Sequence, residues 1–316
     1  MNPYIHTTFF EFFALFFSRL FQLVTFQLNS ELASDEIQIF SLCLIAILGA
    51  VLGAKLVFKK MTMLANALSH TILLGIVLAF LLMGGVFYLP GFVIASVLTG
   101  ILTTFFVQVL TERFKLYEDA AIGYVFTTLF AMGIMLVTLY TKNVHLGLES
   151  IMGNLDALHK DDLSYLFWLC LINVSITVAF FKEFKLISFD SVYSKSLGIN
   201  TGFFNYLLMT QVAFFCVGAF RAVGVILVLS FLVSPVLIAK KAKSLGRVML
   251  FASLIGCLVA IVSVALCRHL LVYYDLPVST AGLTVTLLFI LTLGFYIKKP
   301  SQKRGGLIHN RIPDKV

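Results

Sequence analysis

Ile37 to Phe58, IQIFSLCLIAILGAVLGAKLVF, contains no charged residue before Lys55. A helix needs about 20 predominantly apolar residues to cross the hydrocarbon core of a bilayer, and this stretch is long enough. Its apolar character is continuous, whereas a strand of a transmembrane barrel alternates apolar and polar residues over about ten positions. The stretch therefore predicts a membrane-spanning α-helix.

The rest of the chain repeats this pattern. Of its 316 residues, 60% are hydrophobic and only 12% are charged, against about 25% charged in a soluble domain. Eight further apolar runs are long enough to be spans: 63–83, 91–110, 120–140, 163–181, 203–219, 223–239, 248–267 and 279–297. We predict an all-α, polytopic transmembrane helix bundle of about nine spans, preceded by an N-terminal apolar segment.

The two ends of the chain differ from this bundle. Phe9 to Phe26 is apolar but includes Glu11 and Arg19, so it either lies along the membrane interface or crosses the membrane. No basic residues precede it and no small-residue cleavage site follows, so we expect no cleaved signal peptide. The expected division is an N-terminal apolar segment at 1–36, a transmembrane domain at 37–297 and a basic tail at 298–316.

The basic residues predict the orientation of the spans, because cytoplasmic loops collect Lys and Arg. With the loop after the first span inside, 18 of the 23 basic residues fall on the inner side, and the C-terminus is cytoplasmic. The outer five are Arg19, Lys142, Lys160, Arg221 and Arg268. The net charge of +8 therefore reflects membrane topology, and we expect no nucleic acid partner.

Motifs of the common enzymes are missing from the sequence. It has no H-E-x-x-H, and its five cysteines form no CxxC pair, which argues against a disulfide framework or a structural zinc site. Gly49 to Lys55, GAVLGAK, lacks the spacing of a phosphate loop. Gly49 and Gly53 are instead spaced to let two helices approach closely. We expect that the chain is not an enzyme.

One cluster of polar residues lies deep in a span. Asn66, Ser69 and His70 follow Lys60 by six to ten residues, and a rise of 1.5 Å per residue puts His70 about 15 Å below the inner surface. Asn66 and His70 are four residues apart and share a helical face. Imidazole suits zinc, iron or copper, and oxygen donors extend the set to manganese. The alternative is a histidine that is hydrogen-bonded to a neighbouring helix.

A second candidate lies between two spans on the predicted inner side. Phe189 to Asn200, FDSVYSKSLGIN, reads as a short amphipathic helix that ends at Gly198. Such a helix can dock in a groove of a soluble partner. The alternative is a plain interfacial linker.

These segments together resemble a known family. ANALSHTILLGIVLAF, Ala65 to Phe80, is similar to the G-D-A-x-S-H-x-x-x-P-G signature of the membrane permeases of ABC importers for zinc, manganese and iron. Further resemblances are KLVFKKMTML before it, then ESIMGNLDAL, FDSVYSKSLGIN, RAVGVILVLSFLVSPVLIAKKA and YYDLP in the family's order. They extend from about residue 40 to 297.

The resemblance implies a function and partners. We expect a permease subunit in the bacterial cytoplasmic membrane that works with two cytoplasmic ATPases, an extracytoplasmic metal-binding protein and a second permease, the same or different. It also implies that the metal ligands are His70, Asn66 and Ser69. Contacts with the ATPase are expected from Asp190, Tyr193, Leu197 and Gly198. The chain itself is expected to bind no cofactor, only the transported metal.

The sequence departs from the family signature at three positions. Asn66 stands where the family has Asp, Ala65 where it has Gly, and Leu74 where it has Pro. An amide oxygen is neutral, so it holds a dication less tightly than a carboxylate. Either a partner permease supplies the carboxylate, or this subunit contributes to a weaker transit site.

Other functions stay open at this point. An ion-coupled secondary transporter would need further deep acidic residues, and the predicted spans contain almost none. An ABC permease for a metal chelate or vitamin would need a wide pore and no central histidine. A scaffold protein would leave His70 unexplained.

Overall fold

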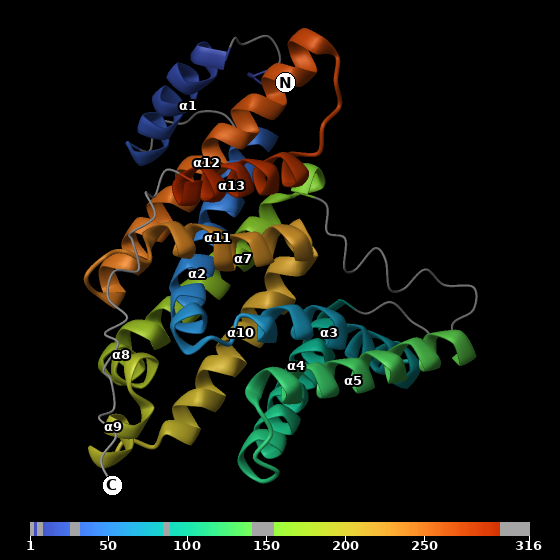
Figure 1. Cartoon of the computed structure of the whole chain (residues 1–316). Coiled ribbons are helices and arrows are strands. Elements are labelled where there is room, and N and C mark those ends of the chain that lie inside the picture. The colour runs from blue at the N-terminus through green and yellow to red at the C-terminus, as the bar shows by residue number, and fades with distance from the viewer. Residues whose placement is uncertain (1–2, 5–8, 26–31, 85–88, 141–154, 298–316) are drawn as a thin grey trace, which may run out of the picture.

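The computed structural model describes residues 3–4, 9–25, 32–84, 89–140 and 155–297. These residues form helices and no strand, which confirms the all-α prediction for the part described (Figure 1). The helices are α1 Phe9–Val24, α2 Ser34–Lys59, α3 Met63–Leu82, α4 Leu89–Glu112, α5 Glu118–Tyr140, η1 Leu155–Ala157, α7 Lys160–Ala179, α8 Phe181–Phe189, α9 Ser191–Ser196, α10 Thr201–Val223, α11 Val225–Ala239, α12 Leu245–Tyr274 and α13 Thr280–Ile297.

The helices coincide with the nine predicted spans. Eight of them within the described residues are long and apolar enough to cross a membrane: α2, α3, α4, α5, α7, α10, α12 and α13. The ninth, α11, has 15 residues and is about 22 Å long, shorter than a bilayer core of about 30 Å. It packs among α2, α12 and α13, so the protein covers much of its surface. About nine spans is therefore consistent with the structure.

Helix α2 is the centre of one group of helices. It packs against α12, α11 and α7, and the backbones of α2 and α11 come into contact. A Cβ placed on Gly53 would lie 2.0 Å from the carbonyl oxygen of Leu232, and one on Gly49 would lie 3.1 Å from the backbone of Phe231. Only glycine permits this approach, which confirms the interpretation of the GAVLGAK spacing.

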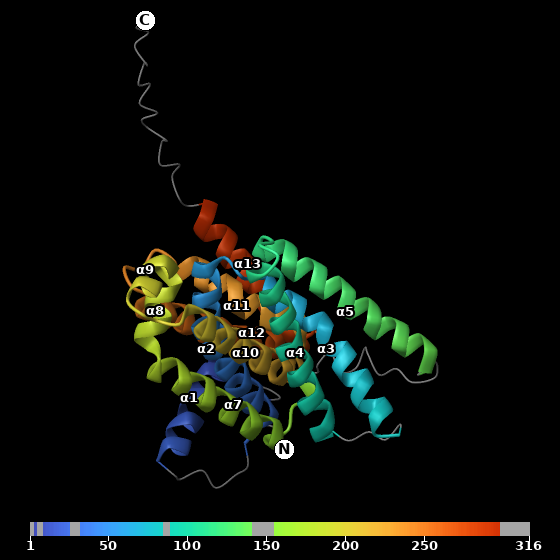
Figure 2. The same cartoon turned by 90° about the horizontal axis from the view of Figure 1, so that it is seen from below.

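A second group consists of α3, α4 and α5. These three helices pack on one another and are joined to the first group mainly through α10 (Figures 1 and 2). Gly75 of α3 lies against α4, because its Cβ would be 2.7 Å from the carbonyl oxygen of Ala95. This second group carries the Asn66 and His70 candidates.

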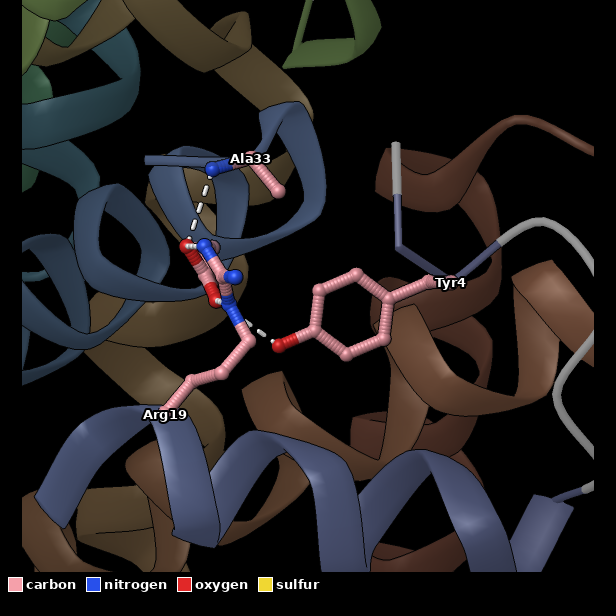
Figure 3. Close-up of polar contacts among 4 residues, drawn as sticks. Tyr4, Arg19 and Ala33 are labelled. Atoms are coloured by element: carbon pink, nitrogen blue, oxygen red, sulfur yellow. Dashed lines mark hydrogen bonds and ion pairs between the residues drawn. The ribbon is translucent and has the colours of Figure 1, made fainter. Parts of the chain in front are cut away.

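The N-terminal helix α1 is not one of the helices long and apolar enough to cross the membrane. It lies at the end of the molecule where α2 begins and α12 ends, and α9 lies at the opposite end (Figure 1). Arg19 of α1 forms an ion pair with Glu36 of α2, and Tyr4 donates its hydroxyl hydrogen to the same carboxylate at 2.8 Å (Figure 3). Burial raises the pKa of Tyr4, which keeps the phenol protonated and able to donate.

Candidate functional site

The metal candidates lie near the beginning of α3. Met63 begins the helix, so His70 lies seven residues or about 10 Å along its axis. The predicted depth of about 15 Å was measured from Lys60, at a rise of 1.5 Å per residue. Lys60 caps α2 in a left-handed conformation with φ of 60° and does not belong to α3. His70 is thus nearer the α2–α3 turn than expected.

His70 and Asn66 share an open face of α3. Asn66 is exposed, and His70 is partly exposed. The imidazole lies beside two phenylalanine rings of α5, with centroid distances of 5.1 Å to Phe126 and 5.2 Å to Phe130. The ring is therefore held by aromatic contacts on one side and is not enclosed.

Ser69 does not share this face. It is 1% exposed, and its hydroxyl donates to the carbonyl oxygen of Asn66 at 2.6 Å. The structure therefore brings His70 and Asn66 together and places the Ser69 hydroxyl in the packed side of the helix.

This chain alone supplies few donors for a metal. Across the residues that the structure describes, no three His, Cys, Asp or Glu side chains gather in a way that could hold an ion. His70 and Asn66 contribute one imidazole and one amide oxygen, fewer than the four ligands usual for protein-bound zinc. A tighter site on this face would need donors from another chain.

Sequence reasoning missed a polar network inside the bundle. Lys55, expected at the inner surface, is fully buried, and its ammonium donates to Thr177 Oγ1 of α7 at 2.9 Å and Gln211 Oε1 of α10 at 3.3 Å. The ammonium also lies 4.2 Å from the ring centroid of Phe184 in α8. Gln211 in turn donates to the carbonyl oxygen of Asn173 at 3.2 Å. Lys55 therefore ties four helices together.

The predicted coupling segment, Phe189 to Asn200, contains the short helix α9 and begins at the last residue of the preceding short helix α8. Asp190 caps α9 by accepting hydrogen bonds from the backbone N–H groups of Val192 at 3.0 Å and Tyr193 at 2.9 Å. Gly198 follows the helix with φ of 79°. Its N–H donates to the carbonyl of Lys195, and the next N–H, of Ile199, donates to Ser194. This is a Schellman ending: α9 ends at Ser196, and Gly198 terminates it as predicted.

The α8–α9 segment exposes apolar side chains at its tip. Val192 is 77% exposed, Tyr193 54% and Leu197 53%. The same segment is packed on α2 behind this surface, where the rings of Phe58 and Phe189 have centroids 5.1 Å apart. The geometry is that of a protruding surface with a direct contact to the central helix.

The opposite end of the molecule has a polar cavity of about 430 Å³ between α2, α12, η1 and α13. Asp35 and Arg268 form an ion pair at its edge, and Thr280 donates to Asp156 Oδ1 at 2.7 Å. The first six residues of the ESIMGNLDAL segment, 149–154, lie outside the described residues.

The comparison with protein families agrees with this architecture. The pattern of the ABC 3 transport family matches residues 37–299, most of the chain. The chain belongs to this ABC 3 transport family. It is therefore a multi-pass membrane permease and a transport subunit, not an enzyme, and it works in a transporter system with an ATPase and a solute-binding partner.

The alignments with relatives cover between 59% and 94% of the chain. A "probable metal transport system membrane protein" of Chlamydia trachomatis is 40% identical over 300 residues, covering 94% of this chain and 92% of the relative. The manganese transport system membrane protein MntD of Bacillus subtilis is 38% identical over 205 residues, 61% of this chain and 69% of the relative. The zinc transport system membrane protein TroD of Treponema pallidum is 34% identical over 199 residues, which cover 59% of this chain and 54% of the relative.

A solved structure shows the same fold. PsaBC from Streptococcus pneumoniae, in complex with Fab, is similar with a TM-score of 0.68 at 24% identity, covering 84% of this chain and 92% of that chain. At this identity the likeness concerns the fold of an ABC 3 permease and not its ligand.

Proposed function

We propose that this permease carries a divalent transition metal, manganese, zinc or iron, across the bacterial cytoplasmic membrane into the cell. The names of the relatives support a metal cargo, since they include manganese and zinc transport systems. The predicted excess of Lys and Arg on one side supports an orientation with the C-terminus in the cytoplasm.

The observation that carries the proposal is the open face of α3. A partly exposed imidazole and an exposed amide lie one turn apart on a helix long enough to span the membrane. Polar groups in such helices are expensive and usually functional. His70 and Asn66 would bind the metal in transit, and a second permease, identical or different, would supply the remaining donors across this face.

A site with few donors from each chain suits transport. The ion must bind well enough to enter and weakly enough to leave. Asn66 adds no negative charge where the family signature has Asp, so this subunit contributes a weak half-site. Any carboxylate would come from the partner permease.

The ATPases would act on the α8–α9 tip. Asp190, Tyr193, Leu197 and Gly198 form or shape this surface, and helix-in-groove docking suits its exposed apolar side chains. Movement of the tip would reach α2 through Phe189 and Phe58. The metal-binding protein would dock at the other end, near the polar cavity at Asp35 and Arg268.

The experiment that tests this function uses the complete purified transporter: this chain, its partner permease if one exists, the ATPases and the binding protein. ATP hydrolysis in lipid vesicles is measured with the binding protein empty and with each of the three metals. We expect stimulation by at least one metal, with that metal found inside the vesicles. Equal hydrolysis with and without every metal, and no accumulation, would contradict a metal cargo.

A further inference from the structure

Helix α1 lies outside the segment that matches the ABC 3 family, which begins at residue 37. It exposes large apolar side chains on a surface that no other part of the described chain covers: Phe10 is 82% exposed, Phe17 58% and Phe21 68%. Burying a phenylalanine side chain away from water is favourable. This surface therefore needs a covering partner.

The exposed residues of α1 divide into two stripes. Positions 10, 14, 17 and 21 fall within about 60° of one another on a helix of 3.6 residues per turn, and all are Phe or Ala. Glu11, Ser18 and Gln22 form an exposed polar stripe about 80° away. The third face, with Phe12 and Phe16 at 1% and 3% exposure, packs on the protein.

The direction in which each stripe points is fixed by the contacts in Figure 3. Arg19 pairs with Glu36, whose carboxylate also accepts hydrogen bonds from Tyr4 and, at 2.8 Å, from the backbone N–H of Ala33. The ion pair sets the rotation of α1 about its axis. The phenylalanine stripe cannot turn inward without breaking it.

The contacts also show that α1 lies at one depth. Near its start, Phe9 lies against His269 of α12 with ring centroids 6.1 Å apart, and ten residues later Arg19 meets Glu36 of α2. His269 and Glu36 lie at the same end of the bundle, because their neighbours Arg268 and Asp35 are ion-paired. The helix therefore runs about 15 Å across the end of the bundle and not along it.

An apolar groove continues from α1 towards the membrane-spanning helices. Leu23 and Leu32 form its wall on the side of α1, and Phe40 and Leu44 of α2 and Trp168 of α7 complete it. Its volume is about 540 Å³, and its lining is almost entirely apolar. In a multi-pass membrane protein, a groove at this place faces acyl chains.

We propose that α1 is an in-plane membrane anchor: its phenylalanine stripe enters the acyl region of the leaflet where α2 begins, and a phospholipid acyl chain of that leaflet occupies the groove at Trp168. An apolar face beside a polar face on a helix lying in the plane is typical of interfacial helices. On the orientation proposed above this leaflet is the outer one, but the inference itself needs only a membrane-embedded bundle.

The test uses quenching of tryptophan fluorescence by lipids brominated in mid-chain. Trp168 is the single tryptophan of the chain, so Trp168→Phe removes the fluorescence of this subunit, and the signal left in the Trp168→Phe transporter is the partners' background to be subtracted. Phe17→Trp and Ser18→Trp are then made separately in this background. These neighbours are both exposed but point about 100° apart, into the apolar and the polar stripe.

The complete transporter is reconstituted in vesicles of phosphatidylglycerol and brominated phosphatidylcholine, with iodide on both sides in a parallel series. We expect brominated lipid to quench Phe17→Trp at least about twofold more than Ser18→Trp, and iodide to show the reverse order. Equal quenching of the two variants would overturn the in-plane orientation. Protection of Phe17→Trp from both quenchers would mean that a second copy or the binding protein covers the stripe, and would also overturn the proposal.

The unaltered protein provides a measurement that does not depend on these variants. Brominated lipid should quench native Trp168, which is 61% exposed and lines the groove. An unquenched Trp168 would overturn lipid occupancy of the groove. Neither result depends on which substrate is carried, so this inference and the metal cargo fail separately.

Discussion

His70 and Asn66 form a face with one imidazole and one neutral oxygen donor, and this composition has a measurable consequence. A carboxylate in place of the amide adds a negative charge next to the transported dication. For Asn66→Asp we expect the metal concentration that gives half-maximal uptake to fall about tenfold, equivalent to about 1.4 kcal/mol. Uptake assays over a range of metal concentrations measure this shift. An unchanged half-saturation would show that Asn66 does not face the ion.

The contact between α2 and α11 depends on a single missing methyl group. In Gly53→Ala, the new Cβ would collide with the carbonyl oxygen of Leu232, so the two helices must separate. We expect destabilisation by about 1–3 kcal/mol, seen as a lower melting temperature in detergent. Gly294→Ala is the matched control, because a Cβ there meets nothing within 4 Å. Equal melting temperatures for the two variants would contradict the close approach.

Residue-level predictions from the sequence succeeded where a pattern within one helix was sufficient. The spacing of Gly49 and Gly53 and the shared face of Asn66 and His70 are properties of a single helix, and both are present. The burial of Lys55 depends on partners 122 and 156 residues away in the chain, so no local pattern could show it. Asp35 and Glu36 of α2 likewise pair with residues of other helices, Arg268 of α12 and Arg19 of α1.

Among the elements, the α8–α9 tip is the one that would transmit the movement of the ATPases to the membrane-spanning helices. Tyr193→Ala and Leu197→Ala should each remove an exposed docking side chain without disturbing the buried part of the bundle. We expect uptake to fall about tenfold or more while the helices still insert, because a docking residue at the centre of an interface contributes about 2 kcal/mol or more. Uptake and ATPase activity are measured together in vesicles.

Ser196→Ala is the control for this tip, because its hydroxyl bonds to the backbone carbonyl of Tyr193 within α9. It should retain coupled uptake. Normal coupling in Tyr193→Ala and Leu197→Ala would instead favour the plain linker interpretation of Phe189 to Asn200.

The junction of α2, α7, α8 and α10 is held by the buried ammonium of Lys55. Gln211→Leu removes one acceptor from that ammonium and leaves a buried charge less well satisfied. We expect a loss of about 1–3 kcal/mol in stability, measured as a lower melting temperature. Thr286→Val, which removes an exposed hydroxyl bonded to its own helix, should have almost no effect. Equal effects of the two substitutions would contradict a structural role for the network.

Helix existence and order could be predicted from hydropathy, whereas some helix ends could not. The span predicted at 248–267 is helix α12, which continues to Tyr274. Arg268 marks a span end when read alone, but it pairs with Asp35 and so stays within the helix. The end of α9 was predictable because the left-handed conformation at Gly198 is encoded locally.

At the scale of the whole molecule, the two groups of helices carry different proposed contact surfaces, and each surface requires a partner. One group of helices, centred on α2, carries the α8–α9 tip at one end and α1 at the other (Figure 1). The polar cavity between α2, α12, η1 and α13 lies at the same end as α1. The second group presents His70 and Asn66 on an open face. The membrane bundle was predictable from composition, but the separation into two groups was not, because it depends on which helices pack together.

The central claim is that a dication crosses the membrane by way of His70. The most direct measurement is ATP-dependent uptake of radioactive manganese, zinc and iron into vesicles containing the complete transporter, with His70→Ala compared with His159→Ala. His159 precedes α7 and is exposed, so it controls for loss of an imidazole. The account predicts that His159→Ala takes up metal normally and that His70→Ala, present at the same level and correctly assembled, does not. Undiminished uptake by His70→Ala would contradict it.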